Sequence, residues 1–195
     1  MKTGYIKIAL WLVIFVLGYF LVQSVMGPIR FNKEKDKRYA AVISNLEDIR
    51  SAQLAYKSVN GNYSSNFDQL INFTDTGRFE IIERKDTSFL AYDKTYRTNL
   101  LKDSTLIRVL GYFGIRDSLF KGVDDLNKMR FIPDTDTEIE LGATRINSGG
   151  IEIPVFEAKA DKNIVLKGLD ASLIELEKDL KIGSLTEATV SGNWN

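Results

Sequence analysis

The stretch Ile8–Val22, IALWLVIFVLGYFLV, decides the architecture of this chain. Its fifteen residues include no charged, amide or aliphatic hydroxyl side chain, and the run continues to Met26 with only Gln23 and Ser24 as interruptions. A helix over residues 8–26 would span roughly 28 Å, close to the hydrocarbon thickness of a bilayer. No other stretch of the sequence is comparable. The sequence therefore predicts a single-pass membrane protein, with most of its 195 residues beyond the span.

The span is expected to be a permanent anchor. Lys2 and Lys7 would suit a secretory signal, but the apolar run exceeds the roughly 7–15 residues usual for one. Residues 23–28 also match a small-residue cleavage site poorly, so a cleaved signal is the alternative. Gly27 and Pro28 should form a kink or hinge at the membrane surface, because proline lacks an amide donor and clashes with the preceding turn.

The orientation of the span is open. By lysine and arginine counts, the rule that favours positive charge inside places the large region in the cytoplasm. The family resemblance described below implies the opposite side. The basic residues that follow the span are Arg30, Lys33, Lys35, Lys37 and Arg38.

Composition narrows the functional classes. The 26 basic residues balance 26 acidic ones, which gives no sign of a nucleic-acid interface. The chain has no cysteine and no histidine, so it can form no disulfide, zinc–thiolate site or serine–histidine triad. We therefore expect a protein that is not an enzyme. A carboxylate-based hydrolase that uses the acidic residues between Asp134 and Glu140 is a remaining alternative.

A second helical pattern follows the charged residues after the span. Apolar and aromatic residues recur at helical spacing from Tyr39 to Tyr56 and form one face of an amphipathic helix. We expect this face to pack on its own domain, with a coiled coil to a partner as the alternative. Asn60-Gly61 should end the helix, and Ser65 or Asn66 should cap a short helix over residues 67–73.

Beyond this point the pattern favours strands, joined by a turn at residues 148–150. Residues 86–102 lack periodicity and are expected to form a long excursion from the sheet. Leucines at 169, 173, 176 and 180 predict a late helix, with Ser172 and Glu175 as its capping box. The expected strands cover residues 79–83, 105–113, 131–133, 137–141 and 151–158.

The predicted fold class is α+β. An N-terminal transmembrane helix would continue after a hinge into an amphipathic helix packed on a small antiparallel sheet. The expected boundaries are an anchor over residues 1–29, a soluble domain over residues 30–185 and a polar tail over residues 186–195.

The stretch Asn45–Asn72, NLEDIRSAQLAYKSVNGNYSSNFDQLIN, resembles the type IV pilin and type II secretion pseudopilin family. The matching features are Leu46, Ala52, Tyr56, residues 60–63 (NGNY) and Leu70, and the resemblance covers roughly residues 5–75. It implies a pilin-like domain on the periplasmic side of a bacterial inner membrane. The wider sequence also resembles envelope proteins of Bacteroidetes-type bacteria.

The chain departs from the pilin pattern at the processing site. If Gly4 ended the leader, the fifth mature position would be Ala9, where the family carries the glutamate that neutralises a neighbour's amino terminus. Ser64-Ser65 replaces the proline that often follows the family's tyrosine. We therefore expect a pilin-like module on an uncleaved anchor.

Two further groups of residues are candidate sites. Asp134, Asp136 and Glu138 alternate with other residues, as would carboxylates on one face of a strand, and they are candidate ligands for calcium. The alternative is a solvated strand face, and no other cofactor is expected. The aromatic residues Phe89, Tyr92, Tyr96, Tyr112 and Phe113 would form either a binding face or part of the core.

The sequence thus predicts a scaffold or assembly component of a bacterial envelope machine. Its expected partners are the lipid bilayer and other proteins, or further copies of itself through the transmembrane and amphipathic helices. The alternative is a membrane-tethered cytoplasmic module that recruits a protein partner to the inner membrane, with Arg30–Arg38 lying against anionic lipid.

Overall fold

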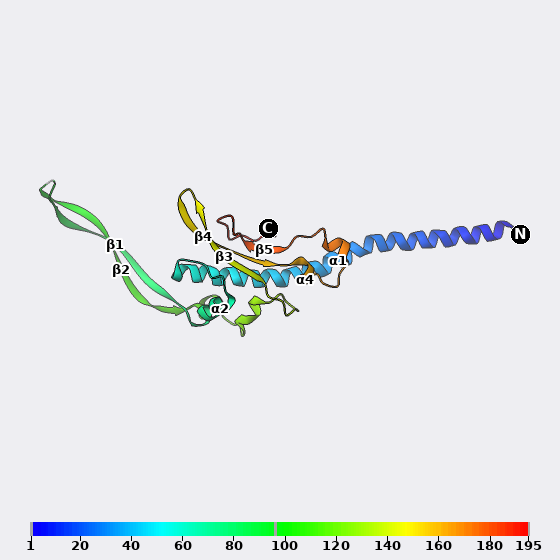
Figure 1. Cartoon of the computed structure of the whole chain (residues 1–195), viewed down its shortest axis with the longest axis horizontal. Coiled ribbons are helices and arrows are strands. Elements are labelled where there is room, and N and C mark those ends of the chain that lie inside the picture. The colour runs from blue at the N-terminus through cyan, green and yellow to red at the C-terminus, as the bar shows by residue number, and fades with distance from the viewer. Residues whose placement is uncertain (1, 96, 195) are drawn as a thin grey trace. The chain divides into compact units, whose positions relative to one another are not determined.

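The computed structural model describes residues 2–95 and 97–194. Its architecture is α+β, as the sequence predicted, with one long N-terminal helix and two small antiparallel sheets where a single sheet was expected (Figure 1). The chain divides into two compact units, Met1–Arg50 with Asn127–Asn195, and Ser51–Leu126. Each unit is described separately.

The helix α1 runs from Lys2 to Asn60 without interruption, with Pro28 inside it. The apolar stretch and the amphipathic helix, which the sequence treated as two helical segments, are therefore one continuous element. Proline removes the bond from its own amide to the carbonyl of Ser24, and the helix continues past it. A bending motion at Gly27-Pro28 stays a prediction.

In the first unit, α1 packs beside the three-stranded antiparallel sheet β3–β4–β5. The strands are β3 (Glu140–Ser148), β4 (Ile151–Ala160) and β5 (Leu180–Gly183). The central strand β4 contributes Phe156, which is fully buried, and Gly149 and Gly150 form the turn before it with positive φ. The turn at 148–150 and the strand at 151–158 are thus confirmed.

The core of this unit combines one face of α1 with the inner face of the sheet. Spacings of four and three residues place Val42, Leu46 and Ile49 on one side of the helix, where all three are buried. The other buried apolar side chains are Phe31, Met129, Ile132, Ile139, Val155, Phe156, Ala158, Ala160, Val165, Leu166, Ile174, Leu180 and Ile182. The amphipathic pattern of the sequence therefore identified the buried face of the helix correctly.

Short helical turns replace the predicted late helix. The helices α4 (Lys162–Val165) and α5 (Ala171–Ile174) are single turns, and Leu180 begins β5. Asp170, not Ser172, caps α5 by accepting from the backbone N–H of Ser172. The leucine spacing was misleading because Leu176 is 78% exposed and has no place in a buried helical stripe.

The second unit holds the end of α1, a short helix and a β-ribbon. The helix α2 (Phe67–Thr76) is capped by Asn66, which accepts from the amides of Asp68 and Gln69 at 2.7 and 3.4 Å. The ribbon consists of β1 (Arg78–Asp93) and β2 (Thr98–Gly114), followed by α3 (Ile115–Leu119). The 3₁₀ helix η1 (Leu126–Arg130) lies where the two units meet in sequence.

The core of the second unit lies between the end of α1, α2 and α3. Its buried apolar side chains are Ala52, Ala55, Phe67, Leu70, Ile115, Phe120 and Leu126. Gln53 is fully buried among them, where its amide bonds the backbone of Ser64 in both directions, at 2.6 and 3.0 Å. This pair holds the turn at Gly61, whose φ of 74° suits glycine, against the helix that precedes it.

The predicted excursion at residues 86–102 is wrong. These residues form the outer part of the ribbon, in a regular antiparallel register that runs from Arg78 opposite Gly114 to Asp93 opposite Thr98. A single bulge between Ile81 and Ile82 shifts the register. The stretch lacks a period of two because neither face of the ribbon is buried, so no face selects apolar residues.

Candidate functional site: membrane anchor and exposed β-ribbon

The first half of α1 exposes apolar side chains on every side. The exposed fraction of its large apolar residues from Leu10 to Ile29 lies between 41% for Met26 and 72% for Phe15. A helix that is apolar all round belongs in a protein core or in a membrane, and this stretch packs against nothing in its own unit. By length and composition, α1 could cross a membrane.

The folded part of the first unit begins directly after this stretch. Phe31, which is 6% exposed, is the first buried side chain along the described part of α1. It lies three positions after Pro28. The end of the apolar stretch and the start of the core thus coincide within one turn of the same helix.

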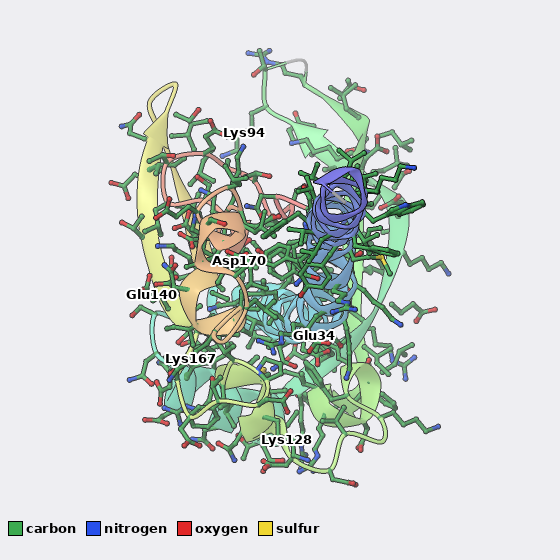
Figure 2. The ribbon with its side chains drawn as sticks, turned by 90° about the vertical axis from the view of Figure 1, so that its right-hand side faces the viewer. Glu34, Lys94, Lys128, Glu140, Lys167 and Asp170 are labelled. Carbon is green, nitrogen blue, oxygen red and sulfur yellow. The ribbon has the colours of Figure 1, made fainter. Side chains whose placement is uncertain are left out.

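Two of the five basic residues after the apolar stretch are already engaged by the first unit. Lys35 Nζ lies 2.8 Å from Glu177 Oε1. Arg38 pairs with Glu34 at 3.1 Å and donates from Nη1 to the carbonyls of Val165 and Lys167 at 3.2 and 2.9 Å. Figure 2 labels Glu34 on α1 and Lys167 on the segment after α4. These two cations help to fix the C-terminal part of the unit to α1.

Tyr39 and Asp179 extend this contact. The Tyr39 hydroxyl donates to the carbonyl of Lys178 at 3.3 Å, and burial together with the charges of Glu177 and Asp179 raises the tyrosine pKa to about 12. Burial alone would raise the pKa of Asp179, but the backbone N–H of Lys162 and the ammonium of Lys159 lower it below the ordinary value. Both side chains therefore have a structural role: one as a neutral donor, the other as a carboxylate acceptor.

The candidate calcium ligands lie on a turn, not on a strand face. The amide of Ile132 bonds the carbonyl of Thr137 at 2.9 Å, and only an isolated bridge joins Phe131 to Glu138. Asp134 sits in this turn with φ 62°. The strands expected at 131–133 and 137–141 are therefore wrong except for their ends, because β3 begins at Glu140.

The three candidate carboxylates have different surroundings. Glu138 lies 2.8 Å from Arg130 Nη2, whereas Asp134 and Asp136 line a shallow hollow of about 360 Å³ with Asn45. Within residues 2–95 and 97–194, no group of three or more acidic, cysteine or histidine side chains is placed to hold a metal ion. Calcium binding at Asp134, Asp136 and Glu138 stays a prediction.

The most exposed apolar surface beyond α1 is the β1–β2 ribbon. Two groups of side chains make up this surface. The basal cluster comprises Ile81, Ile82, Leu106, Ile107, Val109, Leu110, Tyr112 and Phe113, and the tip cluster comprises Phe89, Leu90, Tyr92, Leu100 and Leu101. Most of these side chains are about half exposed or more, and Leu90 reaches 67%.

Both faces of the ribbon carry these residues. Adjacent pairs such as Ile81-Ile82 and Leu100-Leu101 point to opposite faces, because successive strand residues alternate. A polar belt that includes Asp86, Thr87, Ser104 and Thr105 separates the two clusters. An isolated two-stranded ribbon is only marginally stable in water, so an exposed apolar ribbon of this length indicates a contact surface.

The structure divides the predicted aromatic cluster between the two ends of the ribbon. Phe89 and Tyr92 lie in the tip cluster, whereas Tyr112 and Phe113 lie in the basal cluster, and all four are exposed. Tyr96 lies outside the described residues. The core interpretation is wrong for these four aromatic residues, and they do not gather in one place. Sequence reasoning missed that apolar residues stand next to each other in these strands. Neighbouring strand residues point to opposite faces, so both faces carry apolar side chains.

A hollow of about 680 Å³ lies at the base of the ribbon. The end of α1 contributes Ser58 and Val59 to its lining, and the ribbon contributes Phe79, Ile82 and Tyr112. Arg78 and Glu80 add charges of both signs to the lining. The hollow therefore continues the basal cluster toward the helix within the second unit.

Comparison with protein-family models, with curated proteins and with solved structures finds no match for this chain.

Proposed function

We propose that this chain is a non-enzymatic single-pass membrane protein and a scaffold or assembly component of a bacterial envelope machine. In this proposal, α1 crosses the inner membrane and the region after Phe31 is a pilin-like domain in the periplasm. The observation that carries the proposal is the all-round apolar exposure of α1 from Leu10 to Ile29, which ends where the folded unit begins.

Three features support a scaffold over an enzyme. The chain lacks histidine and cysteine, which removes the commonest general base at neutral pH and the commonest thiol nucleophile. Of the candidate carboxylates, Asp134 and Asp136 lie on a turn and Glu138 pairs with Arg130. The ribbon presents its apolar side chains outward, which suits contact with another protein.

The sequence resemblance over residues 5–75 supports the pilin-like part of the proposal. The long α1 and the cap at Asn66 agree with the helix, the stop and the second short helix of that pattern. Ala9 stands where the family's glutamate would be, so the proposal is an uncleaved anchor that supports assembly, not a filament subunit.

The topology of the chain tests this proposal. The full chain with a C-terminal tag is expressed in bacteria, and protease is added to intact spheroplasts and to lysed membranes. We expect cleavage in intact spheroplasts, while a cytoplasmic marker protein stays protected. A tag that is protected until lysis would contradict the periplasmic location.

The same experiment tests the alternative of a cytoplasmic recruitment module. The basic residues after the span favour that alternative by the positive-inside rule, and Arg30, Lys33 and Lys37 are exposed. Lys35 and Arg38 contribute less to a lipid-facing collar, because both are engaged by the folded unit. A protected tag would make membrane-proximal lipid contact through Arg30, Lys33 and Lys37 the next hypothesis.

A further inference from the structure

The β1–β2 ribbon has two long outer edges. Among the described residues, β1 and β2 pair only with each other, so the outward amide and carbonyl groups of both strands have no strand partner. The strands are 16 and 17 residues long, contain no proline and have one bulge. Native proteins usually block such edges with short strands, proline or bulges, because a free edge is a template for another strand.

Lipid is a poor occupant for this ribbon. Unpaired backbone groups are excluded from hydrocarbon, and both strand edges would carry them. The polar belt also carries charge on both faces, with Lys85 on one and Arg84 on the other. Lys94, labelled in Figure 2, and Arg97 lie at the turn that would enter the membrane first. The chemistry of the edges calls for a protein strand.

The register within the ribbon shows which strand would fit. Between Arg78–Gly114 and Asp93–Thr98, no two like charges stand opposite each other, and Glu83 opposes Arg108. Apolar residues oppose apolar residues at Ile82–Val109 and Leu90–Leu101. Cross-strand pairs of these kinds stabilise antiparallel sheets, whereas opposed like charges destabilise them. The register therefore contains matched charged and apolar pairs and no opposed like charges.

We propose that copies of this chain pair edge to edge through their ribbons. The outer edge of β1 in one copy binds antiparallel to the outer edge of β2 in the next, in the register already present within each ribbon. Each contact repeats the Glu83–Arg108 and Ile82–Val109 pairs between copies and satisfies the backbone groups of both edges. The pairing is head-to-tail, and it goes beyond the proposed function because it holds in either compartment.

Two-fold pairing of identical strands fits less well. In a two-fold β1–β1 contact, the residue on the symmetry axis lies opposite the same residue of the other copy. Registers centred on Arg84, Lys85 or Asp86 would therefore bring like charges together. A β2–β2 contact centred on Leu106 avoids this problem but leaves the long edge of β1 unpaired. The β1–β2 arrangement uses both edges.

The absence of cysteine from the chain allows a clean test. Two full-length variants with different epitope tags, Glu83→Cys and Arg108→Cys, are coexpressed, and their membranes are treated with a short membrane-permeant bis-maleimide. We expect a crosslinked product that carries both tags. Both positions are exposed strand residues, so the substitutions should leave the fold intact.

The matched control is Thr87→Cys coexpressed with Arg108→Cys. Thr87 lies four residues from Glu83 along β1, an offset of about 13 Å, so the doubly tagged product should be lost. Equal crosslinking in both combinations would overturn the register. No crosslinking in either would overturn the pairing. Crosslinking of Leu106→Cys with itself, without the doubly tagged product, would replace the proposed arrangement by a two-fold β2–β2 contact.

Discussion

At the scale of single residues, Gln53 and Ser64 hold the chain reversal after α1. The side chain of Gln53 is buried, and it both donates to and accepts from the backbone of Ser64. The sequence predicted that the helix stops at Asn60-Gly61, since glycine and asparagine both tolerate the left-handed backbone conformation found at helix ends. It gave no sign of the Gln53–Ser64 pair, because helical spacing shows which face of a helix is buried but not which backbone groups lie opposite that face.

Replacement of Gln53 tests this pair. Gln53→Ala would leave the buried amide and carbonyl of Ser64 without partners, and it should lower the free energy of unfolding by about 1–3 kcal/mol. Chemical denaturation in detergent, followed by circular dichroism, measures the change. Gln69→Ala is the matched control, because Gln69 is exposed and meets only the hydroxyl of Ser64. Equal losses in the two variants would show that the backbone pair is not what stabilises the turn.

Asp179 should make the stability of the first unit depend on pH. Its carboxylate accepts from the amide of Lys162 at 3.1 Å and lies 3.4 Å from Lys159 Nζ, which lowers its folded pKa despite the opposing effect of burial. A lowered folded pKa contributes stability above the unfolded pKa, and this contribution is lost as pH falls through the folded pKa.

Asp179→Asn should therefore lower stability by about 0.5–1.5 kcal/mol at neutral pH, as expected for a hydrogen-bonded polar group near the surface. The difference from the unmodified chain should shrink as the solution is acidified below the ordinary carboxyl pKa. Denaturation midpoints measured across this pH range test the sign. Asp36→Asn, on an exposed turn of α1, serves as the control. A difference that grows on acidification would contradict the assignment.

At the scale of elements, sequence patterns worked where one face is buried. The spacing of apolar residues identified the buried face of α1, because a packed helix selects side chains at this period. It identified only parts of β1 and β2, at residues 79–83 and 105–113, and missed the strand residues between 86 and 102, because both faces of the ribbon are exposed and mixed in polarity. It failed again at Leu169–Leu180, where four leucines at helical spacing lie on short turns and the first residue of β5.

The exposed side chains of the β1–β2 ribbon should contribute less to stability than the buried side chains of the β3–β4–β5 sheet. Phe89 in the tip cluster is 52% exposed, whereas Phe156 in β4 is fully buried. Phe156→Ala should cost about 3–5 kcal/mol, because it removes buried contacts and leaves a cavity. Phe89→Ala should change stability by less than about 0.5 kcal/mol, as expected for a surface site. Denaturation of the monomeric protein measures both changes. A large loss of stability from Phe89→Ala would mean that the tip cluster is part of a core.

At the scale of the whole chain, the candidate site follows from sequence only in part. The apolar run from Ile8 to Val22 was enough to predict an exposed helix of membrane length, because its composition leaves few alternatives. The proposed docking ribbon was predicted only in part: strands were expected at residues 79–83 and 105–113, but their pairing in one long hairpin that turns between Asp93 and Thr98 was not. The alternation of Asp134, Asp136 and Glu138 suggested one face of a strand, but residues at this spacing also occur in a turn.

The last prediction tests whether α1 is the proposed membrane span. Leu12 and Leu17 are 61% exposed and lie within the apolar stretch of α1. An arginine near the centre of a span costs about 2.5–3.5 kcal/mol in membrane insertion, so Leu12→Arg with Leu17→Arg should move much of the chain from the membrane to the soluble fraction. Carbonate extraction followed by immunoblotting measures the distribution. Leu176→Arg, at a leucine that is 78% exposed outside the span, should leave the chain in the membrane. If the double variant resists extraction as well as this control does, α1 does not hold the protein in the bilayer, and another surface of the chain must do so.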